Sequence, residues 1–224
     1  IENNFCFSMQ LWQWCTSNGI KFIYASSAAT YGNGSAGFDD NNNSGALSSL
    51  YPLNAYGWSK HLFDRRILTL INEGKPAPPQ WAGLKFFNVY GPNEYHKSSQ
   101  QSIVAQTYPY AQNNEAAVLF RSHNPDYRDG GQMRDFIWVD DCVSVVLWLL
   151  KNENISGLFN CGTGKARSFA ELVSAVYTAL DLDPIIKYID TPLNIRDSYQ
   201  YFTEANMERL RAAGYEKPMT ELEE

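Results

Sequence analysis

Tyr56 and Lys60 stand four residues apart in the segment Tyr56-Gly-Trp-Ser-Lys60. On a helix this spacing places the phenol and the ammonium on one face, with their Cβ atoms about 5–6 Å apart. A neighbouring ammonium stabilises phenolate, so the pair has the chemistry of a general base for a substrate hydroxyl. The same spacing also arises by chance in a chain with 14 tyrosines. The alternative is a helix whose tyrosine packs and whose lysine is solvated.

A serine pair, Ser26-Ser27, ends a short apolar segment that precedes this predicted helix. Proteins with parallel sheets bind ligands at the carboxyl ends of their strands, so a hydroxyl there could donate to a substrate oxygen. Taken alone, such serines are more often ordinary loop residues. The ordered set Ser-Ser, Tyr-x-x-x-Lys and then Asn88-Val-Tyr-Gly-Pro92 is more specific than any one member.

The segment Gly32-Asn-Gly34-Ser-Ala-Gly37 matches the G-x-G-x-x-G pattern of dinucleotide-binding turns. Such a turn must open a helix, because the helix N-terminus holds the pyrophosphate. Here the chain continues with Phe38-Asp-Asp-Asn-Asn-Asn-Ser44, which favours loop, and its two Asp side chains would repel phosphate. We therefore predict a flexible loop over residues 32–49 without a phosphate site.

The elements that must position these residues alternate between strands and helices. The apolar patterns and stop signals predict strands over residues 21–26, 84–90, 157–161 and 185–189. They predict helices over residues 8–17, 56–72, 140–150, 169–180 and 203–213. Asp140 or Asp141 is expected to cap the third helix, and Ser168 with Glu171 forms a capping box before the fourth. The alternation predicts an α/β protein with a mainly parallel sheet.

Composition excludes several classes of protein. The chain has 224 residues, 44% of them hydrophobic, with a formal net charge of −6. This excludes a wholly disordered chain and argues against nucleic-acid or membrane-surface partners. The longest apolar run, residues 142–150, is far shorter than the roughly 18 residues of a membrane span. Four cysteines without metal-ligand spacing predict buried free thiols and a cytoplasmic location, and no metal site is expected.

Several motifs together resemble a known family. Tyr24-Ala-Ser-Ser-Ala-Ala-Thr-Tyr-Gly32, the Tyr-x-x-x-Lys pair and Phe87-Asn-Val-Tyr-Gly-Pro92 resemble extended short-chain dehydrogenase/reductases that act on nucleotide sugars. Four further segments narrow the resemblance to the ADP-glyceromanno-heptose 6-epimerase family. These segments are His96-Lys97, Arg134-Asp-Phe136, Phe159-Asn-Cys-Gly-Thr-Gly164 and Leu210-Arg-Ala-Ala-Gly-Tyr215.

The resemblance implies roles for individual residues. It implies catalytic roles for Tyr56 and Lys97 as two bases, for Ser27 as the active-site serine and for Lys60. The residues that it implies for cofactor binding are Asn3, Lys60, Val89 and Lys97. The residues that it implies for substrate binding are Ser27, Asn88, Ser99, Gln106, Phe120, Arg134 and Tyr199. Gln106 replaces a histidine expected in the family, and the Arg134 guanidinium suits a diphosphate.

The resemblance also implies an architecture and its partners. We expect an incomplete Rossmann-like domain over residues 1–91 and a smaller nucleotide-sugar-binding domain over 92–224, with 136–162 returning to the first sheet. The family's opening strand and glycine-rich turn have no counterpart here, so we expect a fragment. The implied cofactor is NADP, with NAD possible, because the residues that select between them belong to the absent segment. The implied partners are an ADP-heptose substrate and further copies of the chain in a pentamer.

The function implied is inversion of C6 of the heptose by transient oxidation, within lipopolysaccharide biosynthesis. Alternatives are another nucleotide-sugar epimerase, a dehydratase, or a binding module or fragment without activity. Ala28-Ala29-Thr30 stands where a dehydratase usually carries an acidic pair, which argues against that reaction.

Overall fold

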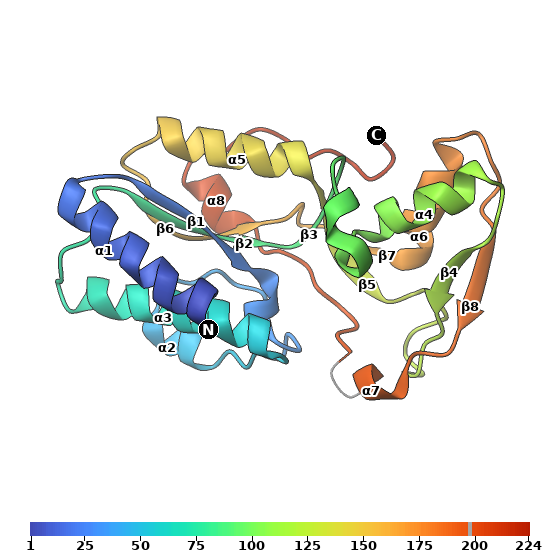
Figure 1. Cartoon of the computed structure of the whole chain (residues 1–224), viewed down its shortest axis with the longest axis horizontal. Coiled ribbons are helices and arrows are strands. Elements are labelled where there is room, and N and C mark those ends of the chain that lie inside the picture. Colours follow the sequence, from blue (N-terminus) through green and yellow to red (C-terminus); the bar gives the residue numbers. More distant parts are fainter. Residues whose placement is uncertain (197–198) are drawn as a thin grey trace.

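The computed structural model describes residues 1–196 and 199–224, without the side chain of residue 99. Figure 1 shows two lobes. One is built on a three-stranded sheet, and the other on a three-stranded and a two-stranded sheet. The chain crosses between the lobes several times, and its last residues run from the first lobe towards the second (Figure 1). Of the helices in the described part of the chain, none has the length and apolar character that a membrane span requires.

The first lobe is a parallel sheet covered by helices on both faces. Its strand order is β1 (Phe22–Ser27), β2 (Trp81–Phe86) and β6 (Gly157–Cys161). Helices α1 (Ser8–Asn18) and α3 (Ala55–Asn72) lie on one face and α5 (Val139–Lys151) on the other (Figure 1). Every residue of β6 is buried, as parallel strands with two covered faces require. The larger hydrophobic core lies around this sheet.

The second lobe contains the remaining strands. Strand β5 (Met133–Trp138) pairs in parallel with β3 (Asn88–Tyr90) and antiparallel with β7 (Ala166–Ser168). Strand β4 (Ala117–Phe120) pairs in parallel with β8 (Ile186–Ile189). Helices α4 (Ile103–Gln112) and α6 (Phe169–Thr178) pack together around a smaller core that includes Tyr177.

Short elements connect these larger ones. They are η1 (Glu2–Phe7), η2 (Ala28–Tyr31), α2 (Ser44–Ser48), η3 (Tyr95–Gln100), α7 (Leu193–Arg196) and α8 (Glu208–Ala212). Two of them matter for the site, because η2 follows β1 directly and η3 carries Lys97.

The predicted α/β fold with a mainly parallel sheet is confirmed. Gly19 ends α1 in the left-handed conformation, and Ser168 and Glu171 form the predicted capping box. The G-x-G-x-x-G segment opens no helix, as predicted, since the chain remains irregular until α2 begins at Ser44. Gly32 is required there for a steric reason, because a Cβ would lie 1.8 Å from the Tyr51 carbonyl oxygen.

Two predicted elements are wrong in their bounds. The predicted strand 84–90 is divided between β2 and β3, because the chain changes sheet at Phe87. The predicted helix 203–213 shortens to α8, since the Thr203 N–H donates to the Met133 carbonyl and draws this segment alongside β5.

Three smaller expectations also need correction. The predicted loop 32–49 contains α2, which forms because the Asn43 side chain caps it by accepting from the Gly45 N–H. Helix α5 begins after Trp138 without a side-chain cap, and Asp140 and Asp141 lie in its first turn instead. Cys6 is exposed, because it lies in η1, an element without buried residues, whereas the other three thiols are buried.

Side chains of the loop before α2 cover the outer edge of β6. Asn42 Oδ1 accepts from the Leu158 N–H at 2.8 Å, and Asp40 Oδ2 accepts from the Asn160 N–H at 2.7 Å. These contacts satisfy edge groups that would otherwise attract another strand. Burial raises the pKa of Asp40 to about 6, against the opposing effects of the Asn160 N–H and Arg209. The loop is therefore tied to the sheet.

His61 is a fully buried histidine on α3. Neither ring nitrogen has a hydrogen-bond partner among the described residues, and the ring packs edge-on against Trp58 at 5.6 Å. Burial, assisted by the charge of Lys85, lowers the pKa of His61 to about 4.

Replacing this histidine, His61→Phe, is expected to raise the free energy of unfolding by about 1–3 kcal/mol, because it removes an unpaired buried polar ring. The folded-state pKa lies below the unfolded value of 6.5, so wild-type stability is complete above pH 6.5 and falls as the pH drops towards 4. The advantage of the variant should therefore grow over that range in urea unfolding followed by tryptophan fluorescence. The same change at exposed His96 should have neither effect. Equal or lower stability of His61→Phe would contradict this account.

Candidate active site

The first two turns of α3 present Tyr56 and Lys60. The helix begins there because the Asn54 side chain caps it, accepting from the Gly57 N–H at 2.8 Å. The Tyr56 side chain is half exposed, and Lys60 Nζ lies 5.9 Å from the centre of its ring. The Lys60 ammonium donates to the Ala25 carbonyl of β1 at 2.9 Å. Burial lowers the pKa of Lys60, and the negative charge of Asp64 opposes that shift.

Ser27 occupies the carboxyl end of β1, two residues after the Ala25 carbonyl that accepts from Lys60. Its Oγ accepts from the Ala29 N–H at 3.1 Å and so caps η2, which leaves its O–H able to donate. Gly57 of α3 lies directly against η2, because a Cβ there would come within 2.6 Å of the Ala29 carbonyl oxygen. This close approach brings the first turn of α3 to the end of β1.

A cavity of about 430 Å³ lies where the chain passes from β2 into β3. Ser27 is level with Phe86 on β2, and the cavity wall begins at the next residue, Phe87. The cavity is therefore at the same edge of the sheet as the first turn of α3. The predicted site residues that line it are Asn88, Val89, Lys97, Arg134 and Tyr199.

Lys97 is held by a carboxylate that the sequence motifs did not single out. Glu94 is buried, and its Oε2 lies 3.3 Å from Lys97 Nζ. The same carboxylate accepts from Ser102 Oγ at 2.7 Å, from the Ser102 N–H at 2.8 Å and from the Gly91 N–H at 3.3 Å. Burial alone would raise the pKa of Glu94, but the bonds from Ser102 and Lys97 outweigh it and the pKa is lowered. The three-residue spacing from Glu94 to Lys97 was the available sequence signal.

Glu94→Gln should free the Lys97 amine while an amide oxygen still accepts from Ser102. The expected result is faster acylation of Lys97 by a small succinimidyl ester, about two- to fivefold, the range for a partly exposed ion pair. Peptide mass spectrometry measures the rate, with exposed Lys75 as the internal reference. Ser102→Ala removes a Glu94 contact but keeps the ion pair, and should leave the rate unchanged. An unaltered rate in Glu94→Gln would show that Glu94 does not hold Lys97.

Arg134 forms a buried wall of the cavity. Its guanidinium donates to the Met133 carbonyl at 2.8 Å and to the Gln200 carbonyl. It also lies 5.5 Å from the Phe169 ring centre and 5.7 Å from that of Tyr199. Burial lowers the pKa of Arg134 and raises that of Tyr199, although each group opposes the shift of the other. The two carbonyl groups and the two rings thus fix the positively charged Arg134 guanidinium at the cavity wall.

Other predicted residues lie away from this cavity wall. Gln106 is exposed on α4, and its amide donates to the Gln101 carbonyl at 2.7 Å. Phe120 ends β4, with its ring 6.3 Å from that of Tyr199. Asn3 is exposed on η1, the element next to α3. The side chain of Ser99 lies outside the described part of the structure.

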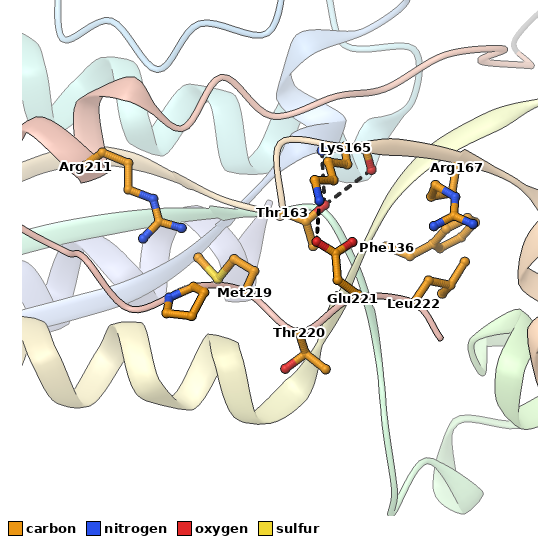
Figure 2. A pocket seen from close by; sticks show the side chains of 10 residues that line it. Phe136, Thr163, Lys165, Arg167, Arg211, Met219, Thr220, Glu221 and Leu222 are labelled. Atoms are coloured by element: carbon orange, nitrogen blue, oxygen red, sulfur yellow. Dashed lines mark hydrogen bonds and ion pairs between the residues drawn. The ribbon is translucent and has the colours of Figure 1, made fainter. Parts of the chain in front are cut away.

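A second cavity, of about 220 Å³, lies between the turn after β6 and the C-terminal segment (Figure 2). Basic side chains line it, but Lys165 pairs with Glu221 and Arg167 pairs with Glu223 at 2.5 Å. Acidic residues of the same chain therefore pair with two of the three basic side chains in the lining, while Arg211 donates to the Tyr215 and Lys217 carbonyls. None of the predicted site residues lines this cavity, and we do not assign it to the site.

The chemistry of the residues around Lys60 decides whether a nicotinamide cofactor would fit at this edge of the sheet. Lys60, a half-buried ammonium at the carboxyl edge of a parallel sheet, stands beside the Tyr56 phenol and is suited to hydroxyls of a ribose. The residues therefore fit the nicotinamide end of such a cofactor, with Asn3 and the Val89 backbone as further predicted contacts. Within the described residues, no group of three or more His, Cys, Asp or Glu side chains is placed to hold a metal ion.

Comparisons with known proteins agree with this architecture. The profile of the family described as "NAD dependent epimerase/dehydratase family" matches residues 1–162. A curated ADP-L-glycero-D-manno-heptose-6-epimerase of Nitratidesulfovibrio vulgaris strain DP4 is 51% identical over 224 residues, covering all of this chain and 67% of that protein. The enzyme of the same name from Fusobacterium nucleatum subsp. nucleatum is 45% identical, covering all of this chain and 68% of that protein.

Solved structures agree with the fold described above. The Helicobacter pylori ADP-L-glycero-D-manno-heptose-6-epimerase is 30% identical and superposes with a TM-score of 0.75, over 98% of this chain and 61% of that one. The UDP-N-acetylglucosamine 4-epimerase of Methanobrevibacter ruminantium M1, at 24% identity and a TM-score of 0.74, shows the shared fold alone. The chain thus spans about two thirds of the length of its curated relatives.

The chain belongs to the NAD-dependent epimerase/dehydratase family, a class of nicotinamide-dependent enzymes with a Rossmann-like sheet, and within it to the ADP-L-glycero-D-manno-heptose-6-epimerases. The resemblance drawn from the sequence motifs is therefore confirmed. Curated relatives at 39–51% identity carry that one name, which makes the family one of isomerases.

Proposed function

We propose that the protein inverts C6 of the heptose in an ADP-glycero-manno-heptose by transient oxidation and re-reduction. The hydrogen on a carbinol carbon is not acidic, so direct proton exchange cannot invert that centre, whereas a planar ketone can be reduced on either face. A bound nicotinamide supplies the hydride acceptor and donor for this chemistry. The remaining tasks fall to the chain: it must bind the nucleotide-sugar, orient C6 and move a proton at the C6 oxygen.

One observation supports this proposal above all. Lys60 Nζ lies beside the Tyr56 ring and donates to the Ala25 carbonyl, two residues before Ser27 at the carboxyl edge of the first sheet, and the cavity lined by Lys97 and Arg134 begins at the same edge. Two groups that can transfer protons thus come from different elements, α3 and η3. A substrate oxygen that changes sides during epimerisation would meet one group before the change and the other after it.

Individual residues take distinct tasks in this scheme. Tyr56 accepts the hydroxyl proton, Ser27 donates to the same oxygen, and the Lys60 ammonium stabilises the phenolate. Lys97 serves as the second acid or base when the oxygen has changed sides. Arg134 contacts the diphosphate, where a fixed guanidinium gives charge and direction. Asn88 and Tyr199 bind other parts of the nucleotide-sugar, as do Ser99, Gln106 and Phe120.

The direct test is conversion of substrate by the intact protein. Incubation with ADP-heptose and either NADP or NAD should interconvert the two C6 epimers, followed by NMR, with no net change in cofactor redox state. UDP-hexoses serve as the comparison. Conversion of a UDP-hexose at C4 without conversion of ADP-heptose would favour a hexose 4-epimerase, and loss of water would indicate a dehydratase.

The proposal extends to the cofactor, the pathway, the cellular location and the oligomeric state of the protein. The cofactor is NADP, with NAD as the alternative, and the product enters lipopolysaccharide inner-core synthesis in the cytoplasm. The protein assembles as a homo-oligomer, a pentamer by analogy with the family. Comparison of the two cofactors in the assay above and sedimentation of the intact protein test the first and the last of these points.

A further inference from the structure

A fully buried carboxylate lies on α3 below the predicted catalytic pair. Asp64 Oδ1 accepts from the Tyr24 hydroxyl at 2.8 Å, while Oδ2 accepts from Ser26 Oγ at 2.6 Å and from Lys85 Nζ at 2.8 Å. The side chains of Asp64 and Lys85 have no exposed surface. The mechanism described above uses neither of these charged groups.

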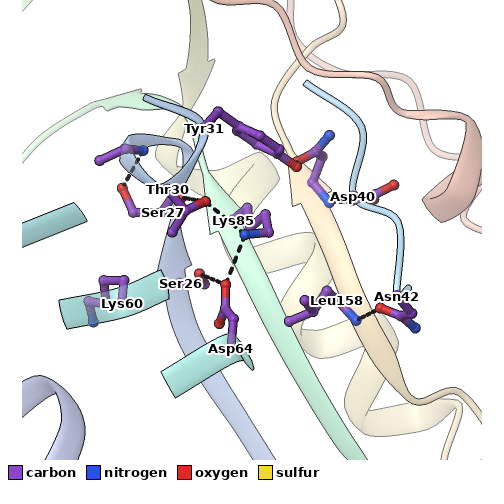
Figure 3. Close-up of polar contacts among 12 residues, drawn as sticks. Ser26, Ser27, Thr30, Tyr31, Asp40, Asn42, Lys60, Asp64, Lys85 and Leu158 are labelled. Carbon is purple, nitrogen blue, oxygen red and sulfur yellow. Dashed lines mark hydrogen bonds and ion pairs between the residues drawn. The ribbon is translucent and has the colours of Figure 1, made fainter. Parts of the chain in front are cut away.

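Lys85 extends the network to a third element. Its ammonium also donates to Thr30 Oγ1 at 2.7 Å and lies 5.0 Å from the ring centre of Tyr31, both in η2 (Figure 3). The pair therefore joins α3, the two strands β1 and β2, and η2. Helix α3 carries Tyr56, β1 carries Ser27, and β2 leads directly into the segment that contains Asn88.

The placement on α3 connects the network to the predicted site. Tyr56, Lys60 and Asp64 follow one another at intervals of four residues, which places them along one side of the helix. Ser26, which donates to Asp64, is the immediate neighbour of Ser27. Lys60 makes a second connection between the same helix and strand through the Ala25 carbonyl.

We propose that Asp64 and Lys85 are positioning residues, which hold the Tyr56–Lys60 side of α3 at a set distance from Ser27 and supply the negative charge that acts on Lys60. The catalytic part of this proposal rests on the proposed function. The part that concerns the negative charge acting on Lys60 does not depend on it. Stability alone does not account for the pair, because buried ion pairs can often be replaced by apolar residues of similar volume without loss of stability. Directional bonds, in contrast, define one relative position of the elements that they join.

Electrostatics gives the proposal a second observable. Burial lowers the pKa of Lys60 and the Asp64 charge raises it. Several charged and titratable groups lie around Asp64: Lys60 and His61 on the same helix, Lys85 from β2, Tyr24 from β1 and Tyr31 from η2. Loss of the Asp64 charge should therefore lower the pKa of Lys60.

The test compares four variants of the intact protein. Asp64→Asn and Lys85→Met each remove one charge, and the double variant Asp64→Leu/Lys85→Met replaces the pair by apolar side chains. Lys85→Arg keeps the charge. Lys21→Met serves as the control, because it breaks an exposed ion pair between the residue before β1 and Glu153 in the turn after α5. Each variant is measured by thermal unfolding, by kcat and KM for ADP-heptose, and by the pH midpoint of Lys60 acylation, read by peptide mass spectrometry.

The single variants are expected to be destabilised and the double variant to recover stability. We expect kcat in the double variant to stay lower by about tenfold or more while KM changes little, because misplaced proton-transfer groups slow the chemical step. Lys85→Arg should retain most of the activity. The Lys60 midpoint should fall by about half a pH unit or more in Asp64→Asn and in the double variant.

A double variant with wild-type stability and kcat within about twofold of wild type would overturn the positioning role. Equal Lys60 midpoints in wild type and the double variant would overturn the role of the Asp64 charge, even if the single variants fail to fold. If the wild-type protein does not convert ADP-heptose, the proposed function fails, and the Lys60 midpoints still decide the independent part of this proposal.

Discussion

Tyr56→Phe should lower the rate of epimerisation by the intact protein about 10²- to 10⁴-fold, the usual worth of a positioned acid–base group. The change removes one hydroxyl and keeps the ring, which is half exposed at the start of α3. The Asn54 cap and the Gly57 contact with η2 do not involve that hydroxyl, so the helix should begin unchanged. The loss should therefore appear in kcat, without a change in the thermal unfolding midpoint.

The measurement is interconversion of the two C6 epimers of ADP-heptose, with bound cofactor quantified in the same sample. Tyr95→Phe is a matched control, because that tyrosine is 86% exposed and is not among the residues that line the cavity. Full activity of Tyr56→Phe would exclude the phenol as a proton acceptor. Loss of bound cofactor together with activity would instead assign Tyr56 to cofactor binding.

Lys97→Met should produce a second large loss, again on the order of 10²-fold or more. Lys97 reaches the cavity from η3, whereas Tyr56 reaches the edge of the sheet from α3. One group cannot replace the other if the substrate oxygen changes sides between the two proton transfers. Each single variant should therefore be deficient by itself, and the double variant should be little worse than the poorer single one.

Exposed Lys75 provides the matched substitution, Lys75→Met, which should retain wild-type turnover. Cofactor should remain bound in Lys97→Met, since the principal lysine for the nicotinamide ribose is Lys60 in this scheme. If both Tyr56→Phe and Lys97→Met kept full activity, the two-base mechanism would be excluded.

Sequence patterns predicted the local elements well where a few neighbouring residues decide the outcome. The capping box of Ser168 and Glu171, the glycine that ends α1 and the rejection of the G-x-G-x-x-G segment depend on contiguous residues. The segment from Leu84 to Tyr90 was predicted as one strand, because residue types along the chain cannot show with which sheet each half pairs. The chain changes sheet at Phe87, and that change creates the cavity wall.

The residues of the candidate site likewise fall into those that sequence motifs selected and those that only the packing of distant segments revealed. Family motifs selected Lys97 and Arg134 but not Glu94, which lies just three residues before Lys97 and holds it. The burial of Arg134 between Phe169 and Tyr199 requires residues 35 and 65 positions further along the chain. Such contacts follow from packing between distant segments, so no local spacing could have indicated them.

The sequence by itself determined that Tyr56 and Lys60 share one side of a helix, since 3.6 residues per turn bring positions four apart together in any helix. It also determined the family, through ordered motifs that occupy most of the chain. Only the tertiary structure decided that Asp64 and Lys85, 21 positions apart, form one buried ion pair beneath that helix. The physical reason is desolvation: a buried charge needs hydrogen bonds or an opposite charge to compensate for lost water, and which groups meet depends on how α3 packs against β1 and β2.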